Sequence, residues 1–281
     1  MKKLVFISLL LANSNIILSQ SKVSTSKSEL NSGSSNSGSS SSNNSSGSSR
    51  SSSNLSDEEA GLIEEILGGI FYGIYFTFGG DYGKEGHLHN DLTHYPYYDK
   101  ESGNYEPDGT SDSIARKKNF RFDLQDNFLY SDSKLYANHL KAKIRPLQYF
   151  YVQADYHQLF EKNEATNTTD KLALFYFNVG YDRIRFENVN VGWTLGASYV
   201  GNEVRKAGYS VGLNTEIFFG HNLSFLASAK WSEINSKPVN LYELEAKYHI
   251  KRSFVSLGFE HLRIASPTYN FITVGTGIYL N

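Results

Sequence analysis

The chain of 281 residues contains no cysteine, and this absence excludes several kinds of site. Without a thiol the protein can form no disulfide bond and no thiolate metal site, and no lipid can be attached to an N-terminal cysteine. The formal net charge is only −2, from 27 basic and 29 acidic residues, so no strong electrostatic field is predicted. The sequence therefore gives no reason to expect a nucleic-acid partner.

Long apolar runs are also scarce. The run from Ile66 to Phe78 has thirteen residues, too few for a helix that crosses a bilayer. Tryptophan occurs only twice, whereas there are 20 tyrosines and 18 phenylalanines. Tyrosine suits a membrane interface because its ring is apolar and its hydroxyl group stays in contact with water.

The N-terminal 56 residues are predicted to lie outside any folded core. Residues 1–19 combine Lys2 and Lys3 with the apolar run Leu4–Ala12, as in a signal peptide, and we expect cleavage before Gln20, with a site near Ser14 as the alternative. Residues 20–56 form a Ser/Gly/Asn-rich segment with 20 serines between Ser21 and Ser56. Its low apolar content predicts a disordered linker.

Alternation of apolar and polar residues dominates the remainder of the chain. In residues 189–199 every odd position is apolar and every even position is small or polar, which gives a β-strand one apolar and one wet face. Eleven residues match a tilted membrane-spanning strand. The pattern recurs about ten times, at 119–130, 135–145, 149–160, 171–182, 189–200, 207–218, 223–232, 241–250, 254–263 and 270–280.

This recurrence behind an export signal predicts an all-β fold, a transmembrane antiparallel up-and-down β-barrel over 119–281 with about ten strands. A cysteine-free exported chain fits the bacterial outer membrane, with lipid as its surroundings. The polar connections 161–170, 201–206, 233–239 and 264–268 are predicted to be longer than the tight turns at 145–148, 219–222 and 250–253, which would be periplasmic. A soluble sandwich or barrel is the alternative, but it would bury the apolar face and expose the other.

Residues 57–80 lie between the linker and the barrel. Their sequence predicts a short amphipathic helix over Asp57–Ile70 and a possible strand over Phe71–Gly79. That strand, paired with another from the following segment, would raise the strand count to twelve. The helix is expected to pack on the barrel rim, to plug the lumen or to dock a protein partner. Residues 81–118 are polar, rich in tyrosine and predicted to be a long loop.

The final strand carries a more specific pattern. Residues 273–280 resemble the C-terminal β-signal of outer-membrane proteins, with Gly275 followed by hydrophobic residues at Ile278 and Leu280. The usual signal has aromatic residues at these last two positions and often ends on phenylalanine, whereas this chain ends on Asn281. The resemblance implies recognition of the last strand by the barrel assembly machinery.

The inward face of the predicted barrel carries charges of both signs in similar number. The predicted lumen-lining residues are Arg121, Asp123, His139, Lys141, Lys143, Asp155, His157, Glu216, Lys230, Glu243, Glu245, Lys247 and Glu260. A ten-stranded lumen is only slightly wider than one that side chains fill. We therefore expect paired charges to fill it, with a narrow channel for small polar solutes as the alternative.

One spacing on this face suggests an enzyme. Asp155 and His157 resemble the Asp-x-His element of omptin-type barrel proteases, which also have ten strands, and they are expected near the external rim. The resemblance implies a second acidic pair opposite, for which only Asp126, Asp132 or Glu260 is available. Because Asp-x-His is common by chance, a structural ion pair is preferred and no enzyme activity is predicted.

Two other clusters have the residue types of metal sites. His87, His89 and His94, with Asp91 between them, can in principle bind zinc, and the stretch Asp99–Asp112 offers oxygen ligands for calcium. Neither follows a standard spacing, so solvated loop side chains are preferred and no metal or cofactor is predicted. The leading hypothesis is a structural or interaction barrel in the outer membrane that presents residues 57–70 or 81–118 to a protein partner.

Overall fold

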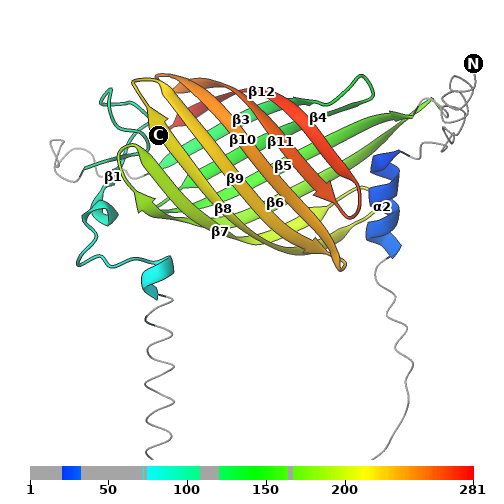
Figure 1. The fold of residues 1–281 in the computed structure, drawn as a ribbon, viewed down its shortest axis with the longest axis horizontal. Helices are drawn as coiled ribbons and strands as arrows, with labels where there is room; N and C mark the ends of the chain where they lie inside the picture. Colours follow the sequence, from blue (N-terminus) through cyan, green and yellow to red (C-terminus); the bar gives the residue numbers. More distant parts are fainter. Residues whose placement is uncertain (1–20, 33–71, 73–74, 108–119, 164–166) are drawn as a thin grey trace, which may run out of the picture.

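The computed structural model describes residues 21–32, 72, 75–107, 120–163 and 167–281 (Figure 1). Ten of its strands form one closed barrel. They are β3 (Arg121–Tyr130), β4 (Leu135–Arg145), β5 (Phe150–Asn163), β6 (Thr168–Arg185), β7 (Val189–Val200), β8 (Lys206–Phe219), β9 (Leu223–Ile234), β10 (Lys237–Ile250), β11 (Ser253–Ile264) and β12 (Thr268–Leu280). Each strand pairs with the next along the chain, and β12 pairs antiparallel with β3 to close the ring. Within these described ranges, no helix is both long and apolar enough to cross a membrane.

The ten strands follow the predicted segments closely, and the predicted fold class is confirmed. Burial alternates along them, as in β12, where Ile272 and Ile278 are exposed between buried neighbours. The outer wall is apolar: Leu195, Leu244 and Leu257 expose 56%, 60% and 59% of their surface. An apolar outer wall around a closed antiparallel barrel is the arrangement that lipid requires, and the protein resides in the bacterial outer membrane.

The alternative of twelve strands is wrong, because residues 75–78, part of the possible strand Phe71–Gly79, are helical. The predicted contrast between long and short connections is also wrong. Strands β9 and β10 continue to a two-residue turn at Asn235 and Ser236, whose φ angles of 53° and 61° suit a tight hairpin. Polar residues that were assigned to longer connections, such as those at 233–239, therefore belong mostly to the ends of strands.

We name the two ends of the barrel by what lies there. The termini rim contains the start of β3, the end of β12 and the turns at 146–149, 186–188, 220–222 and 251–252. The opposite rim contains the turns at 131–134, 201–205, 235–236 and 265–267, and is called the α2 rim because helix α2 packs there (Figure 1).

Helix α2 (Lys22–Ser32) falls inside the segment predicted to be a disordered linker, and this part of the prediction is wrong. Ser21 begins the helix, its hydroxyl group accepting a hydrogen bond from the Ser24 amide. Val23 and Leu30 are completely buried. Tertiary packing of these two apolar side chains outweighs the low helix propensity of the surrounding serines. The predicted signal peptide, the helix over 57–70 and the rest of the linker lie outside the described residues.

The termini rim is covered by part of the predicted loop. Residues 81–107 contain the short helix η1 (Gly86–His89) and a two-stranded sheet of β1 (Asp91–Leu92) and β2 (Tyr105–Glu106). We call residues 81–107 the termini cap. Residues 108–118, the remainder of the predicted loop, lie outside the described part of the chain.

Replacing Leu195 by arginine tests the assignment of the outer wall. Leu195 is the seventh of twelve residues in β7 and more than half exposed, so a charge there meets the centre of the hydrocarbon layer. Leu195→Arg should lower the free energy of unfolding in lipid by about 2–4 kcal/mol, whereas Phe219→Arg, at a strand end, should cost at most about 1 kcal/mol. Denaturant unfolding in vesicles measures both, and equal costs would contradict the assignment.

Candidate functional site

The lumen is filled by side chains that meet from opposite walls. The residues predicted to line it are all on the inward faces of their strands and are buried or partly buried. They fall into three clusters along the barrel axis, and an apolar layer follows at the α2 rim.

The cluster nearest the termini rim is built on arginine. Arg145 Nη1 lies 2.6 Å from Asp182 Oδ2, and Arg121 Nε lies 2.8 Å from Asp123 Oδ1. The termini cap takes part, because the Tyr105 hydroxyl group donates a hydrogen bond of 2.7 Å to Asp182. This end of the lumen is closed by cap and barrel together.

Lys143 has a different neighbour in this cluster. Its Nζ lies 4.6 Å from the centre of the Tyr151 ring, a cation–π contact. Tyr151 is completely buried, and its ring lies so close to Gly180 that a Cβ atom there would be 2.2 Å from it. A glycine on β6 thus makes room for the ring that receives the lysine.

Three lysine–carboxylate pairs lie in the middle of the lumen, and two of them cross it. They are Lys247–Glu216 (3.2 Å), Lys141–Glu243 (2.5 Å) and Lys230–Asp155 (2.7 Å). Glu245 lies 3.6 Å from Lys141 as a further acidic neighbour. The Lys141 and Lys230 pairs each join strands that are four apart around the barrel, so their attraction acts across the lumen rather than along the wall.

The third cluster contains two stacked histidines. His139 on β4 and His157 on β5 are register partners, and their ring centres are 3.5 Å apart. Glu260 on β11 reaches both: its two carboxylate oxygens lie 2.9 Å from His139 Nδ1 and 2.9 Å from His157 Nε2. Asp155 approaches the other nitrogen of His139 at 3.4 Å. All four side chains are buried.

Above the histidines the inward face becomes apolar. Buried side chains from nine of the ten barrel strands, all but β8, meet here with Val23 and Leu30 of α2. The barrel members are Leu129, Leu135, Ala137, Leu159, Leu172, Leu174, Tyr176, Val200, Val204, Ile234, Val239, Leu241, Leu262, Ile264, Ala265, Tyr269 and Phe271. This apolar layer separates the charged lumen from the α2 rim, and it was not predicted, although the same alternation that identified the inward charges runs through it.

Polar contacts hold α2 on this layer. The Glu161 carboxylate accepts hydrogen bonds of 2.7 Å from the Ser21 hydroxyl group and from the Val23 amide. Ser26 donates to the carbonyl of Ile264, and the Asn235 side chain donates to the carbonyl of Leu30. Helix α2 is therefore fixed to the end of β5 at its N-terminus and to the turn at 235–236 near its C-terminus.

The position expected for the Asp-x-His pair is wrong. Asp155 and His157 lie beneath the apolar layer rather than at an external rim, at 2% and 0% exposure. Asp155 bonds to Lys230, and His157 bonds to Glu260. Of the acidic residues considered for the opposite wall, only Glu260 faces the pair, while Asp126 is exposed and bonds to Asn138. The omptin-like arrangement was expected near an external rim, so a buried pair that is closed off from that rim does not match it.

The histidines of the termini cap do not form a common site. His87 stacks on Phe186, His89 bonds to the carbonyl of Tyr82, and His94 contacts Asn281. Asp99 accepts hydrogen bonds from Ser102 within its own turn. Among the described residues, the only group of three or more potential ligands with donor atoms in mutual reach is His139, His157 and Glu260.

Sequence reasoning missed the charges at the end of β6. The strand extends three residues beyond its predicted end, with an irregularity between Asp182 and Ile184 that turns Arg185 inward. Arg185 donates hydrogen bonds to the carbonyls of Asp182 and of Leu88 in the cap. Alternation alone predicts Asp182 on the inward face. No pattern in the sequence predicts the register shift that turns Arg185 inward as well.

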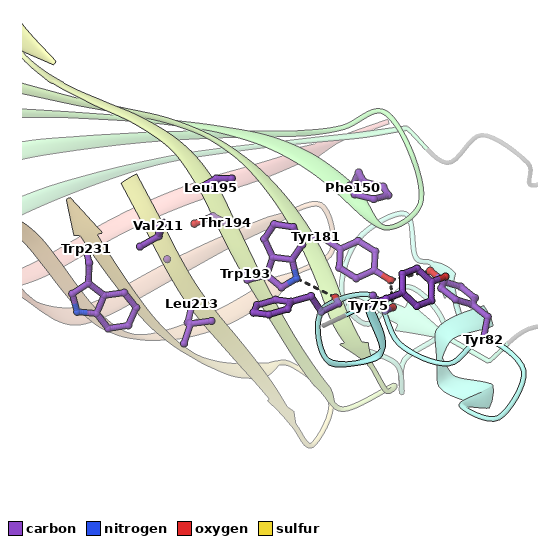
Figure 2. Close-up of a pocket in the computed structure, with 13 residues that line it drawn as sticks. Tyr75, Tyr82, Phe150, Tyr181, Trp193, Thr194, Leu195, Val211, Leu213 and Trp231 are labelled. Carbon is purple, nitrogen blue, oxygen red and sulfur yellow. Dashed lines mark hydrogen bonds between the residues drawn. The ribbon is translucent and has the colours of Figure 1, made fainter. Parts of the chain in front are cut away.

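An apolar groove of about 790 Å³ lies on the outside of the barrel, where residues 75–82 contact β6 and β7, and β8 forms part of its lining (Figure 2). Trp193 donates a hydrogen bond to the carbonyl of Phe78, and Tyr181 donates one to the carbonyl of Gly79. The groove lies outside the lumen and belongs to the wall that lipid covers. Aromatic side chains with one polar atom are suited to this interface.

An ion pair also holds the termini cap to the wall. Arg183 donates two hydrogen bonds of 2.8 Å to the carboxylate of Glu85. These hydrogen bonds from Arg183 lower the pKa of Glu85 to about 2, from an ordinary value of 4.5. The contact favours the ionised carboxylate, so its stabilising effect is present above pH 4.5 and is lost as the pH falls towards 2.

Removing one member of a crossing pair tests the lumen. Lys230→Met leaves the buried Asp155 carboxylate without its closest cation, and such a loss typically costs about 3–5 kcal/mol. The pair of Lys27 and Glu203 provides the control, because the Glu203 side chain is 74% exposed and Glu203→Gln should cost at most about 1 kcal/mol. Denaturant unfolding of the refolded proteins gives both values, and a silent Lys230→Met variant would contradict the network.

The pKa of Glu85 predicts how the termini cap responds to acid. The protection of residues 76–90 against hydrogen exchange, relative to the intrinsic rate at each pH, should stay constant from neutral pH to about pH 4.5 and fall as the pH approaches about 2. Glu85→Gln should accelerate the exchange already at neutral pH, whereas Lys84→Gln, with its exposed side chain, should not. Equal exchange in the two variants would show that the ion pair does not hold the cap.

Comparisons with solved structures give matches at a low level of similarity. The barrel is similar to LpxR from Salmonella typhimurium (12% identity, TM-score 0.35, covering 58% of this chain and 84% of that one). It is also similar to the NanC porin, with 9% identity and a TM-score of 0.34, over 57% of this chain and 100% of that one. A further match is the outer-membrane protein Ail of Yersinia pestis, with 12% identity and a TM-score of 0.34, over 57% of this chain and 99% of that one.

No protein-family model matches this chain, and no curated protein matches it in sequence. The general class rests on the molecule itself: a closed antiparallel barrel, an apolar outer wall and a polar interior. The protein is a small bacterial outer-membrane β-barrel protein.

Proposed function

We propose that this protein is a closed barrel with a structural or interaction role, which anchors in the outer membrane and presents a rigid surface at its rim. The observation that carries the proposal is the set of ion pairs across the lumen. Lys141–Glu243 and Lys230–Asp155 join opposite walls at 2.5 and 2.7 Å, so the side chains occupy the path that a solute would need.

The free space and the apolar layer support the same role. The charged part of the lumen holds a cavity of about 70 Å³, which accommodates only a few water molecules. The layer around Leu159, Leu262 and Phe271 contains no exposed side chain. Ions would have to lose their hydration to pass such a layer, which is costly.

The termini cap is the surface best suited to a partner. It is held by Arg183, Arg185 and Gln148, whose side chains bond to atoms of the cap. Close to it, Leu147 exposes 60% of its surface. A segment that is already ordered needs little further ordering on binding, which favours affinity.

Assembly requires one other partner in this proposal. Strand β12 forms the seam with β3 from Leu280↔Phe122 to Ile272↔Tyr130. The partial β-signal at residues 273–280 supports recognition of this strand by the barrel assembly machinery before the seam closes.

A narrow channel for small polar solutes is the second candidate. The cavity favours it, because it is lined by charges of both signs, including Lys143 and Glu216. Rearrangement of the ion pairs would then have to open a path. An omptin-like surface protease is the most distant alternative, and the burial of Asp155 and His157 argues against it.

Planar-bilayer recording of the refolded full chain tests the closed barrel. No discrete conductance steps are expected, and deletion of residues 21–32 should leave the bilayer silent because the crossing ion pairs remain. The triple variant Lys141→Ala, Lys230→Ala, Lys247→Ala serves as the positive control for an emptied lumen. Its migration on a denaturing gel must still change on heating, as expected for a folded barrel. Conductance of the unaltered chain would overturn the proposal in favour of the channel.

A further inference from the structure

The histidine cluster is arranged as a metal site by the backbone itself. His139 and His157 stand directly opposite each other on neighbouring strands, and both face the lumen. Cβ atoms of such a pair are about 4.5–5.5 Å apart, so two imidazoles reach one point with no change of backbone. The register of β4 and β5 thus supplies two nitrogen ligands at a fixed separation.

Glu260 supplies the third ligand from the other side of the lumen. Its carboxylate lies between the two rings, 2.9 Å from a nitrogen of each. The three donor atoms lie within 4.8 Å of one another. Donors around a zinc ion lie about 2.0–2.2 Å from the metal, so a small closing movement of the side chains completes the site.

Asp155 has the place of an orienting partner. Ligating histidines usually donate their second ring N–H to a carboxylate, which fixes the tautomer and the ring direction. His139 would bind through Nδ1, and its Nε2 lies 3.4 Å from Asp155 Oδ1. Lys230 holds the other carboxylate oxygen of Asp155 at 2.7 Å, so the orienting group is itself fixed.

From this arrangement we infer that the lumen binds one divalent transition-metal ion, best matched by zinc, through His139 Nδ1, His157 Nε2 and Glu260. Two imidazoles and one carboxylate are a ligand set that zinc accepts, with the fourth position left for water. The ion would take the place of the protons that now lie between Glu260 and the two rings. Binding therefore releases protons and strengthens as the pH rises.

The ion would have a structural effect. It joins β4 and β5 to β11, which lies three strands from β4 around the barrel. Because the unfolded chain does not hold these three residues together, zinc should stabilise the folded state. The apolar layer lies between the site and the α2 rim, so exchange of the ion with solution should be slow.

The experiment uses the full chain refolded with zinc sulfate and then dialysed against metal-free buffer. About one zinc ion per chain should remain by mass spectrometry, and the thermal unfolding temperature should exceed that of protein refolded without metal. His139→Asn and Glu260→Gln should each weaken zinc binding by more than about tenfold, because even loss of an orienting partner weakens binding by 10–100-fold.

His249→Asn is the matched control, because His249 is also a buried histidine of the lumen but bonds to Ser224 instead. It should retain zinc at the level of the unaltered chain. Substitution by cobalt adds a readout of geometry, since the visible absorption of a four-coordinate site should appear in the unaltered chain and disappear in His157→Asn.

A change of migration on a denaturing gel after heating identifies the variants that fold. Only these variants are compared for zinc binding. A folded unaltered chain that retains no zinc would overturn the inference. Equal retention by His139→Asn, Glu260→Gln and the unaltered chain would overturn it as well, and would assign the bound metal to another part of the protein.

Discussion

Closure of the ring by β12 and β3 is the constraint on which the other features depend. In hydrocarbon every backbone N–H and C=O group needs an internal partner, and a sheet with two free edges cannot provide one. The seam supplies these partners over the nine residue pairs between β3 and β12. Once the ring is closed at ten strands, the width of the lumen is set, and side chains are long enough to meet across it.

The filled lumen places charges where water is scarce, and the protein compensates for this by pairing. Each cationic side chain in the middle of the barrel has a carboxylate within 3.2 Å. Buried pairs often contribute little net stability compared with apolar packing, but they penalise any arrangement that separates them. In this barrel the pairs also fix which strands face one another, since most join walls that share no backbone hydrogen bonds.

The sequence predicted the strands of the barrel wall better than the side chains that fill the lumen. Alternation identified all ten strands because lipid on one side and polar contents on the other act on every second residue. The inward face of β10 illustrates the limit: Glu243, Glu245 and Lys247 were identified as lining the lumen, but Val239 and Leu241 on the same face were not. Helix α2 was missed because Val23 and Leu30 are its only buried apolar residues, and the surface on which they pack exists only after the barrel closes.

Helix α2 and the termini cap contact opposite rims, so each end of the barrel is covered by a segment that precedes the barrel strands in the sequence. The two covers differ in chemistry, because α2 lies on the apolar layer whereas Tyr105 of the cap bonds to the buried carboxylate of Asp182. Loss of either cover would therefore expose a different surface to water, apolar side chains at one rim and paired charges at the other.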